Sequence, residues 1–181
     1  MKKLMLLLSL PVMIISCGEK KSEPAPAETP VVEAPKPQVT YPYEALLAND
    51  WTIGNPERIV QVLNLYKLMQ DSNFTDSAAM PYFADSLTSV SFDERVYAGN
   101  PKGFFENVRR FRSQFKEIDE EFVTYVCLHS ESRGMDMVSL WFKEKVIRNN
   151  GKADSTRYQE NWTFNRDGKI THRTAVARYG F

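Results

Sequence analysis

The sequence predicts an α+β domain in which three N-terminal helices pack on one face of a curved antiparallel sheet. Between residues 55 and 115 apolar side chains recur at helical spacing. Beyond Lys116 the apolar period changes to two, which is typical of strands. Asn150-Gly151 and Asp167-Gly168 are turn dipeptides that predict tight hairpins within this second half. Helices with one early strand, followed by a run of strands, indicate a two-layer α+β architecture.

The helices are predicted from their caps and from their apolar stripes. Asn55-Pro56 and Asn100-Pro101 each place an N-cap asparagine before a proline at the first helical position. A second, shorter helix is expected over 78–84. The apolar stripes that follow the two Asn-Pro pairs are Ile59, Val62, Leu63, Tyr66 and Met69, and Phe104, Val108, Phe111 and Phe115.

The strands are predicted at 87–93, 121–130, 137–147, 155–165 and 169–179. If both turn dipeptides form two-residue loops, Trp141 lies opposite Glu160, and Trp162 lies opposite Arg173. A slip of one residue in either hairpin would invert part of this assignment. We expect the more aromatic face to meet the helices, and it carries Trp141, Tyr158, Glu160, Trp162, Phe164, Arg173 and Tyr179.

The first seventeen residues have the composition of an export signal. Lys2 and Lys3 precede an apolar run that is shorter than the ~20 residues a membrane helix needs and has the length of a secretory h-region. Ile14-Ile15-Ser16-Cys17 resembles the lipobox of bacterial lipoproteins. That resemblance implies cleavage before Cys17 and a diacylglyceryl thioether on its sulfur, with palmitate as an acyl chain. Gly18 rather than an aspartate follows Cys17, which is compatible with attachment to the outer membrane of the cell envelope, on the periplasmic side or at the cell surface. A plain secretory signal is the alternative.

The chain therefore divides into a signal peptide (1–16), a lipidated cysteine with a proline-rich disordered linker (17–42) and a folded domain (43–181). At ~3 Å per residue the linker could hold the domain up to ~70 Å from the bilayer. After cleavage the chain would carry 21 basic and 23 acidic side chains. It therefore lacks the excess of positive charge that is typical of proteins that bind nucleic acid. A lipidated Cys17 leaves Cys127 without a disulfide partner, and we expect it to be a small buried hydrophobe.

Three segments of the folded part resemble the NTF2-like superfamily, in its SnoaL-like branch. They are Tyr82-Phe83-Ala84-Asp85-Ser86, Tyr97-Ala98-Gly99 followed by Phe104-Phe105, and the hairpin segment Trp162 to Ile170. The resemblance covers the chain from about Trp51 onward. It implies a cone-shaped fold with a pocket between helices and sheet, and it does not separate enzymes from non-enzymes, because this fold serves both.

Glu160 and Arg173 are the charged candidates for that pocket, together with Tyr66, Phe104, Trp141 and Trp162. A carboxylate between aromatic rings has a raised pKa and suits acid–base work. A structural Glu160–Arg173 ion pair is the favoured interpretation. Steroid isomerases of the superfamily use a tyrosine and an aspartate, which implies weak catalytic candidates in Tyr66 and Asp93, although Asp93 comes two residues late.

No spacing of histidines, cysteines and carboxylates predicts a metal, and no motif predicts a cofactor. The leading hypothesis is therefore a non-enzymatic, lipid-anchored domain that binds a small apolar ligand or a protein partner. The alternative is a pocket enzyme of isomerase, dehydratase or hydrolase type that uses an acid–base carboxylate and a tyrosine. A third interpretation is a purely structural protein. The resemblance also implies a homodimer through the outer face of the sheet.

Overall fold

The computed structural model describes residues 50–71 and 73–179. The predictions for the export signal, for lipidation of Cys17 and for the proline-rich linker lie outside these residues. Within the part that is described, no helix has the length and apolar character needed to cross a bilayer.

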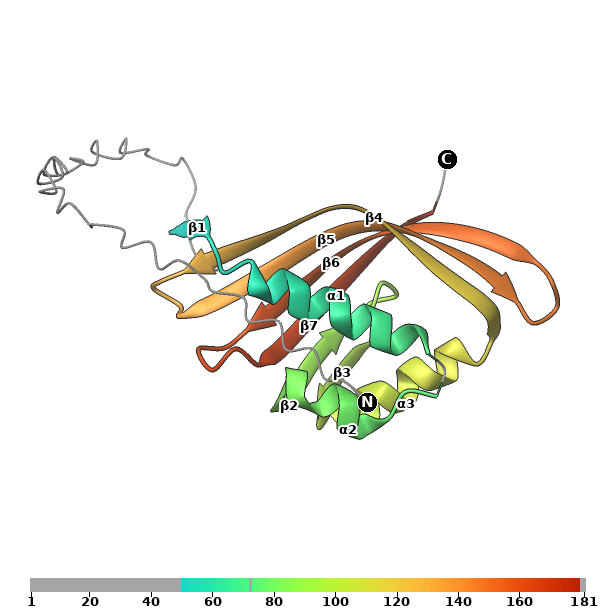
Figure 1. The fold of residues 1–181 in the computed structure, drawn as a ribbon, viewed down its shortest axis with the longest axis horizontal. Coiled ribbons are helices and arrows are strands. Elements are labelled where there is room, and N and C mark those ends of the chain that lie inside the picture. The colour runs from blue at the N-terminus through green and yellow to red at the C-terminus, as the bar shows by residue number, and fades with distance from the viewer. Residues whose placement is uncertain (1–49, 72, 180–181) are drawn as a thin grey trace, which may run out of the picture. The chain divides into compact units, whose positions relative to one another are not determined.

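Seven strands form one curved sheet in the order β1-β4-β5-β6-β7-β2-β3 (Figure 1). Neighbouring strands pair antiparallel except β2 and β7, which run parallel, so the sheet is mixed rather than antiparallel as predicted. The strand bounds are β1 Trp51–Ile53, β2 Phe83–Val90, β3 Val96–Gly99, β4 Phe115–Ser130, β5 Met135–Arg148, β6 Ala153–Phe164 and β7 Ile170–Tyr179.

Three helices lie on one side of the long strands (Figure 1). They are α1 Glu57–Gln70, α2 Asp76–Ala79 and α3 Pro101–Arg112, and a 3₁₀ turn, Met80–Tyr82, follows α2. The predicted cap of α3 is present, because Asn100 Oδ1 accepts from Lys102 N at 3.0 Å and Pro101 is the first helical residue. Helix α1 begins one residue later than predicted, with Pro56 at the N-cap, and Asn55 Oδ1 accepts from Glu57 N at 2.9 Å just before it. The second helix is shorter and earlier than 78–84, because β2 already begins at Phe83.

The four C-terminal strands lie where the sequence predicts them, with one early start. β4 begins at Phe115, so Phe115 belongs to the sheet and not to the stripe of α3. Within α3, Phe105 is fully buried although it was not in the predicted apolar stripe. Phe111, which was in that stripe, is 39% exposed. The strands β1 and β3 were not predicted. Each has only three or four residues, which is too short a segment for an alternating apolar pattern to be recognised in the sequence.

The predicted register between β5 and β6 is wrong by one residue. Trp141 pairs with Gln159, and Leu140 pairs with Glu160. The turn is a three-residue loop in which Arg148 N donates to Lys152 O at 2.9 Å. A type I′ turn needs positive φ at both central residues, and here only Gly151 adopts it, at +82°. Trp141 therefore lies on the outer face of the sheet, and Leu140 and Phe142 take the inner one.

The predicted register between β6 and β7 is correct, with Trp162 opposite Arg173. This hairpin also has a three-residue loop, closed by Asn165 N donating to Lys169 O at 2.9 Å. The ladder shifts again between Thr163 and Phe164, which leaves Thr171 without a cross-strand partner. This bulge cancels the extra loop residue.

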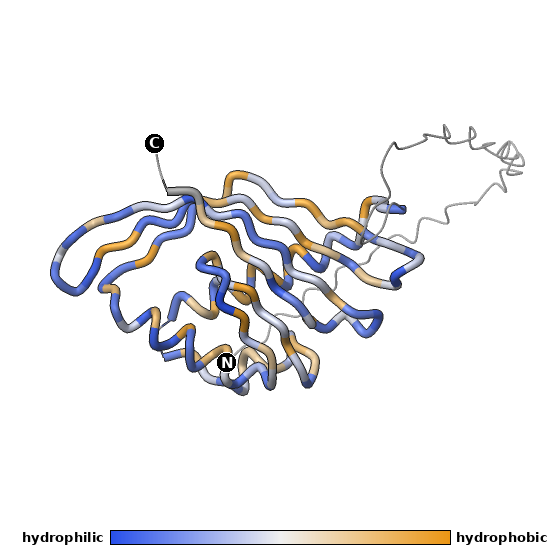
Figure 2. The backbone as a smooth tube through the Cα atoms, turned by 180° about the vertical axis from the view of Figure 1, so that it is seen from behind, coloured by the Kyte–Doolittle hydropathy of each residue, from blue (hydrophilic) through white to orange (hydrophobic). Residues whose placement is uncertain are grey.

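The core lies between the helices and the inner face of the sheet. Figure 2 shows apolar and polar residues alternating along the long strands, as a sheet with one covered face requires. Cys127 belongs to this core at 3% exposure, and burial raises the pKa of its thiol to about 11, as expected of a small buried hydrophobe. The largest fully buried side chains from helices and strands include Val62, Leu65, Phe105, Leu140, Trp162, Phe164 and Ile170.

Candidate functional site

A three-residue polar network crosses the centre of the core. The Tyr66 hydroxyl on α1 donates to Glu160 Oε2 at 2.5 Å. Arg173 on β7 donates its Nε to the same oxygen at 2.9 Å and its Nη2 to Glu160 Oε1. Glu160 is 3% exposed and Tyr66 is 7% exposed. The network satisfies both oxygens of the carboxylate, as a buried charge requires.

The electrostatics of this network keep Glu160 paired with a charged partner. Burial alone would lower the pKa of Arg173, but the adjacent Glu160 outweighs burial and the pKa is raised. Burial, and then the charge of Glu160, raise the pKa of Tyr66 well above its usual value. The hydroxyl therefore keeps its proton and the guanidinium keeps its charge. The predicted Glu160–Arg173 pair is present, and Tyr66 is its third member.

Aromatic rings close the space around this network. The guanidinium carbon of Arg173 lies 5.4 Å from the centroid of Trp162 and 5.8 Å from that of Phe104. The Tyr66 ring makes edge contacts with the rings of Phe122, Phe142 and Trp162. The indole Nε1 of Trp162 is buried without a hydrogen-bond partner in the described part of the chain. Of the predicted pocket residues, Tyr66, Phe104, Glu160, Trp162 and Arg173 therefore meet in a filled core.

Two of the predicted site residues lie elsewhere. Trp141 is on the outer face, because of the register described above. Asp93 lies in the exposed turn between β2 and β3 and forms an ion pair with Arg95 at 2.6 Å. Hydrogen bonds from Arg95 and Ser91 hold the pKa of Asp93 at about 2. An exposed carboxylate with so low a pKa is a poor general base at neutral pH.

A second group of polar side chains on the inner face was not predicted. Glu120 on β4 pairs directly with Glu144 on β5, so the two carboxylates share one face. Gln70, the last residue of α1, donates its Nε2 to Glu120 Oε2. Arg112 at the end of α3 donates its Nε to the Gln70 carbonyl at 3.0 Å, which fixes this corner. The C-terminal ends of α1 and α3 thus meet next to the acidic pair Glu120 and Glu144.

Both carboxylates of the acidic pair have raised pKa values. Burial, followed by the charges of Glu120 and Glu160, raises the pKa of Glu144 to about 7, against a hydrogen bond from Tyr158. Burial also raises the pKa of Glu120, and Gln70 and Arg112 oppose the shift. Glu144 can therefore both take up and release a proton near neutral pH, which is the property of a general acid or base.

The sequence held a signal for this pair that the predicted register concealed. In the register expected from Asn150-Gly151, Glu144 falls on the outer face with the other even-numbered residues of β5. The observed register turns it inward, two residues from Phe142 and on the same face. Correct placement of a single turn would have brought Glu144 to the face of Glu160.

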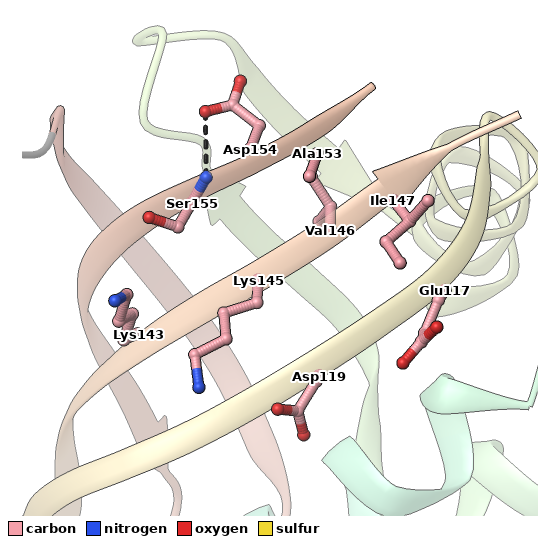
Figure 3. Close-up of a pocket in the computed structure, with 9 residues that line it drawn as sticks. All are labelled: Glu117, Asp119, Lys143, Lys145, Val146, Ile147, Ala153, Asp154 and Ser155. Atoms are coloured by element: carbon pink, nitrogen blue, oxygen red, sulfur yellow. Dashed lines mark hydrogen bonds between the residues drawn. The ribbon is translucent and has the colours of Figure 1, made fainter. Parts of the chain in front are cut away.

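Two hollows lie outside the core. One, of about 620 Å³, is on the sheet near the β5–β6 turn, where acidic side chains of β4 lie beside Lys143 and Lys145 of β5 (Figure 3). Another, of about 420 Å³, lies between the β4–β5 and β6–β7 turns and includes His129 and Arg166. Within the described residues no group of three or more histidines, cysteines and carboxylates is placed to hold a metal ion.

Solved structures show the fold of this chain. An NTF2-like protein of unknown function from Exiguobacterium is similar with a TM-score of 0.52 at 16% identity, over 65% of this chain and 98% of that one. A candidate dehydratase of the NTF2-like family from Streptomyces avermitilis gives 0.56 at 12% identity, over 68% and 96%. A candidate SnoaL-like polyketide cyclase from Shewanella denitrificans gives 0.53 at 8% identity, over 68% and 92%.

No family model and no curated protein matches the sequence. At these identities the similarity establishes an NTF2-like fold and nothing about activity. The fold includes proteins described as enzymes and proteins without an assigned reaction.

Proposed function

We propose that the protein is a lipid-anchored envelope protein whose NTF2-like domain is a non-catalytic binding module, with a second copy of the chain as its partner on the outer face of the sheet. The observation that carries this proposal is the filled interior. Trp162 is fully buried and Phe104 is 6% exposed where a ligand of the cone would sit.

The interior is a poor host for a small apolar ligand. Its central ion pair is already saturated, since both oxygens of Glu160 accept hydrogen bonds from Tyr66 and Arg173. A ligand that entered would have to displace the packed rings around this ion pair, and it would find no unsatisfied oxygen on Glu160.

The outer face of the sheet is pre-organised for a partner. Ser139 donates to Asn161 Oδ1 at 2.6 Å, and Asn161 Nδ2 donates to Thr174 at 3.4 Å, so a polar ladder crosses three strands. A parallel row consists of Trp141, Gln159 and Val176. Val176 is 56% exposed. An aromatic and an exposed aliphatic side chain beside ordered polar groups are typical of the centre of a protein interface.

Two matched valine substitutions test this surface. Val176 on the outer face and Val60 on α1 are equally exposed, at 56%. We expect sedimentation of the full chain in detergent to show a dimer for the wild type and for Val60→Lys, and a monomer for Val176→Lys. Burial of a charge in the interface is the physical reason for the loss. A wild type that remains monomeric, or a Val176→Lys variant that still dimerises, would contradict the proposal.

The lipid anchor is tested separately. In cells supplied with an alkyne analogue of palmitate, we expect the wild-type chain to incorporate the label and to sediment with membranes. Cys17→Ser removes the sulfur and should abolish both results, while Cys127→Ser, at the other cysteine, should leave both unchanged. Label retained by Cys17→Ser would overturn the anchor without affecting the outer-face proposal.

An acid–base enzyme is the second candidate, and Glu144 is the observation that favours it. Its pKa of about 7 and its neighbour Glu120 provide a proton donor and acceptor that Glu160 cannot provide in its saturated network. If this candidate holds, mass spectrometry of the purified chain should detect a small molecule that Glu144→Gln fails to retain. If the chain carries no small molecule, the binding module remains the better account.

A further inference from the structure

The hollow between the β4–β5 and β6–β7 turns joins three separate parts of the chain. His129 and Asp136 come from β4 and β5, and Arg166 comes from the turn after β6. Arg58, in the first turn of α1, reaches the same place and donates its Nε to Asp136 Oδ2 at 3.3 Å. The volume of about 420 Å³ is that of a small-molecule site.

The negative charge of Asp136 is already engaged inside this hollow. Its two oxygens contact Arg58 Nε, as above, and His129 Nδ1 at 2.8 Å. The side chain of Asp136 is only 14% exposed. Asp136 therefore orients the histidine ring and directs Nε2 outward, rather than offering a free acceptor to a ligand.

Donor groups remain available around the opening. Arg166 is exposed and forms no ion pair with any residue that the structure describes. Its guanidinium lies against Gly134, where a Cβ atom would come within 2.1 Å of Nε, so the turn backbone supports it. Asn165 also lines the hollow, and its Oδ1 accepts from Lys169 N at 2.9 Å, so its amide nitrogen is the group of this side chain that can donate to a ligand.

One carboxylate already occupies the outward nitrogen of the histidine. Glu131 Oε2 lies 3.1 Å from His129 Nε2, yet the Glu131 side chain is 94% exposed. An ion pair with so exposed a partner contributes little and is readily exchanged. The Glu131 carboxylate therefore marks the position at which the carboxylate of a ligand would accept a hydrogen bond from His129 Nε2.

We propose that this hollow is a carboxylate-binding site in which Arg166, Asn165 and His129 supply the donors, and in which Glu131 occupies the histidine until a ligand displaces it. Arginine and charged histidine are the donors that form the strongest hydrogen bonds to carboxylates. The site is separate from the outer face and from the core network, so it does not depend on the proposed function.

The site has a predicted pH dependence. Glu131, and then Asp136, raise the pKa of His129. The charged groups that face the ring are Glu131 and Asp136, with Arg58 behind Asp136 and Arg166 across the hollow. Carboxylate binding should therefore be strongest below the pKa of His129 and should weaken as the pH rises through it, because the Nε2 proton is then lost.

The two histidines of the chain make the experiment specific. The full chain, ¹³C-labelled at histidine and held in detergent micelles, is titrated with sodium acetate at constant ionic strength. We expect the His129 resonance to shift and saturate, while His172 on β7 stays constant. Acetamide, the neutral analogue of acetate, should shift neither resonance.

Variants separate the carboxylate site from general salt effects. Arg166→Gln should weaken acetate binding about fivefold or more, because it removes a charge-assisted contact. Glu131→Gln should strengthen binding, because its carboxylate no longer competes, and Arg110→Gln on α3 should have no effect. A non-saturating shift, an equal response to acetamide, or an unchanged affinity in Arg166→Gln would overturn the proposal.

Discussion

Two carboxylates on the inner face of the sheet, Glu160 on β6 and Glu144 on β5, have opposite surroundings. Glu160 is 3% exposed and accepts hydrogen bonds from Tyr66 and Arg173 at both of its oxygens. Glu144 is half-buried, accepts no hydrogen bond from an arginine in the described part of the chain and faces the like charge of Glu120. Burial alone does not decide whether a carboxylate is available for chemistry. A deeply buried carboxylate with a full set of donors is structural, and a shallower one without them retains an adjustable proton.

The largest expected effect breaks the saturated side of this comparison. Arg173→Met removes the two hydrogen bonds that Arg173 donates to Glu160 and leaves a buried carboxylate without a cationic partner, so we expect a loss of about 3–5 kcal/mol in the free energy of unfolding. Urea denaturation followed by circular dichroism measures it. The double variant Arg173→Met with Glu160→Gln should recover most of the loss, because no buried charge remains. A loss below about 1 kcal/mol for the single variant would show that water reaches Glu160.

Tyr66→Phe should have a smaller effect on the same network. It removes one hydrogen bond to a charged acceptor and preserves the ring contacts with Phe122 and Phe142, so we expect about 1.5–3 kcal/mol of destabilisation. The same denaturation experiment with Tyr158→Phe, beside Glu144, provides the matched comparison. Equal losses for the two variants would remove the distinction between the two carboxylates.

The smallest expected effect concerns Glu144 and depends on pH. Its pKa is about 7 in the folded chain and about 4.5 in the unfolded one, so the native state binds more protons between these values. Stability should therefore fall as the pH rises from about 4.5 to 7. Glu144→Gln should reduce this fall, to which Glu120 also contributes, and raise the free energy of unfolding at pH 8 by about 1–3 kcal/mol.

The control for that prediction is Glu121 on the outer face. Lys145 lowers the pKa of Glu121, through a contact of 2.9 Å, so this carboxylate has the opposite shift. Glu121→Gln should leave the fall in stability between pH 4.5 and 7 in place. A wild type without that fall would show that Glu144 is ionised throughout the range.

The sequence predicted the ion pair of Glu160 with Arg173 but not the buried position of Glu144. Glu160 and Arg173 could be placed together because β6 and β7 are consecutive strands with the expected register. Tyr66 could be assigned to a buried stripe from helical spacing, although not to Glu160, because the crossing of α1 over the sheet is a tertiary property. Trp141 was misplaced and Glu144 went unnoticed for one reason, since a single loop residue reverses every side chain of a strand.

The parallel pairing of β2 with β7 could not be predicted from local signals. The two strands are separated by most of the domain, and no turn connects them. β2 was expected to end at residue 93, whereas its ladder with β3 ends at Val90. The intervening turn holds Asp93, which explains why the aspartate lies on the surface rather than in the core.

The bulge at Thr171 has a consequence for how this domain can change in length. The extra residue in the β6–β7 loop and the unpaired Thr171 cancel, so Arg173 faces Glu160 only while both are present or both are absent. Deletion of one residue from that loop alone would turn Arg173 to the outer face. Glu160 would then lose its cationic partner. Insertions and deletions at these two sites should therefore be inherited together, as a coupled pair of indels.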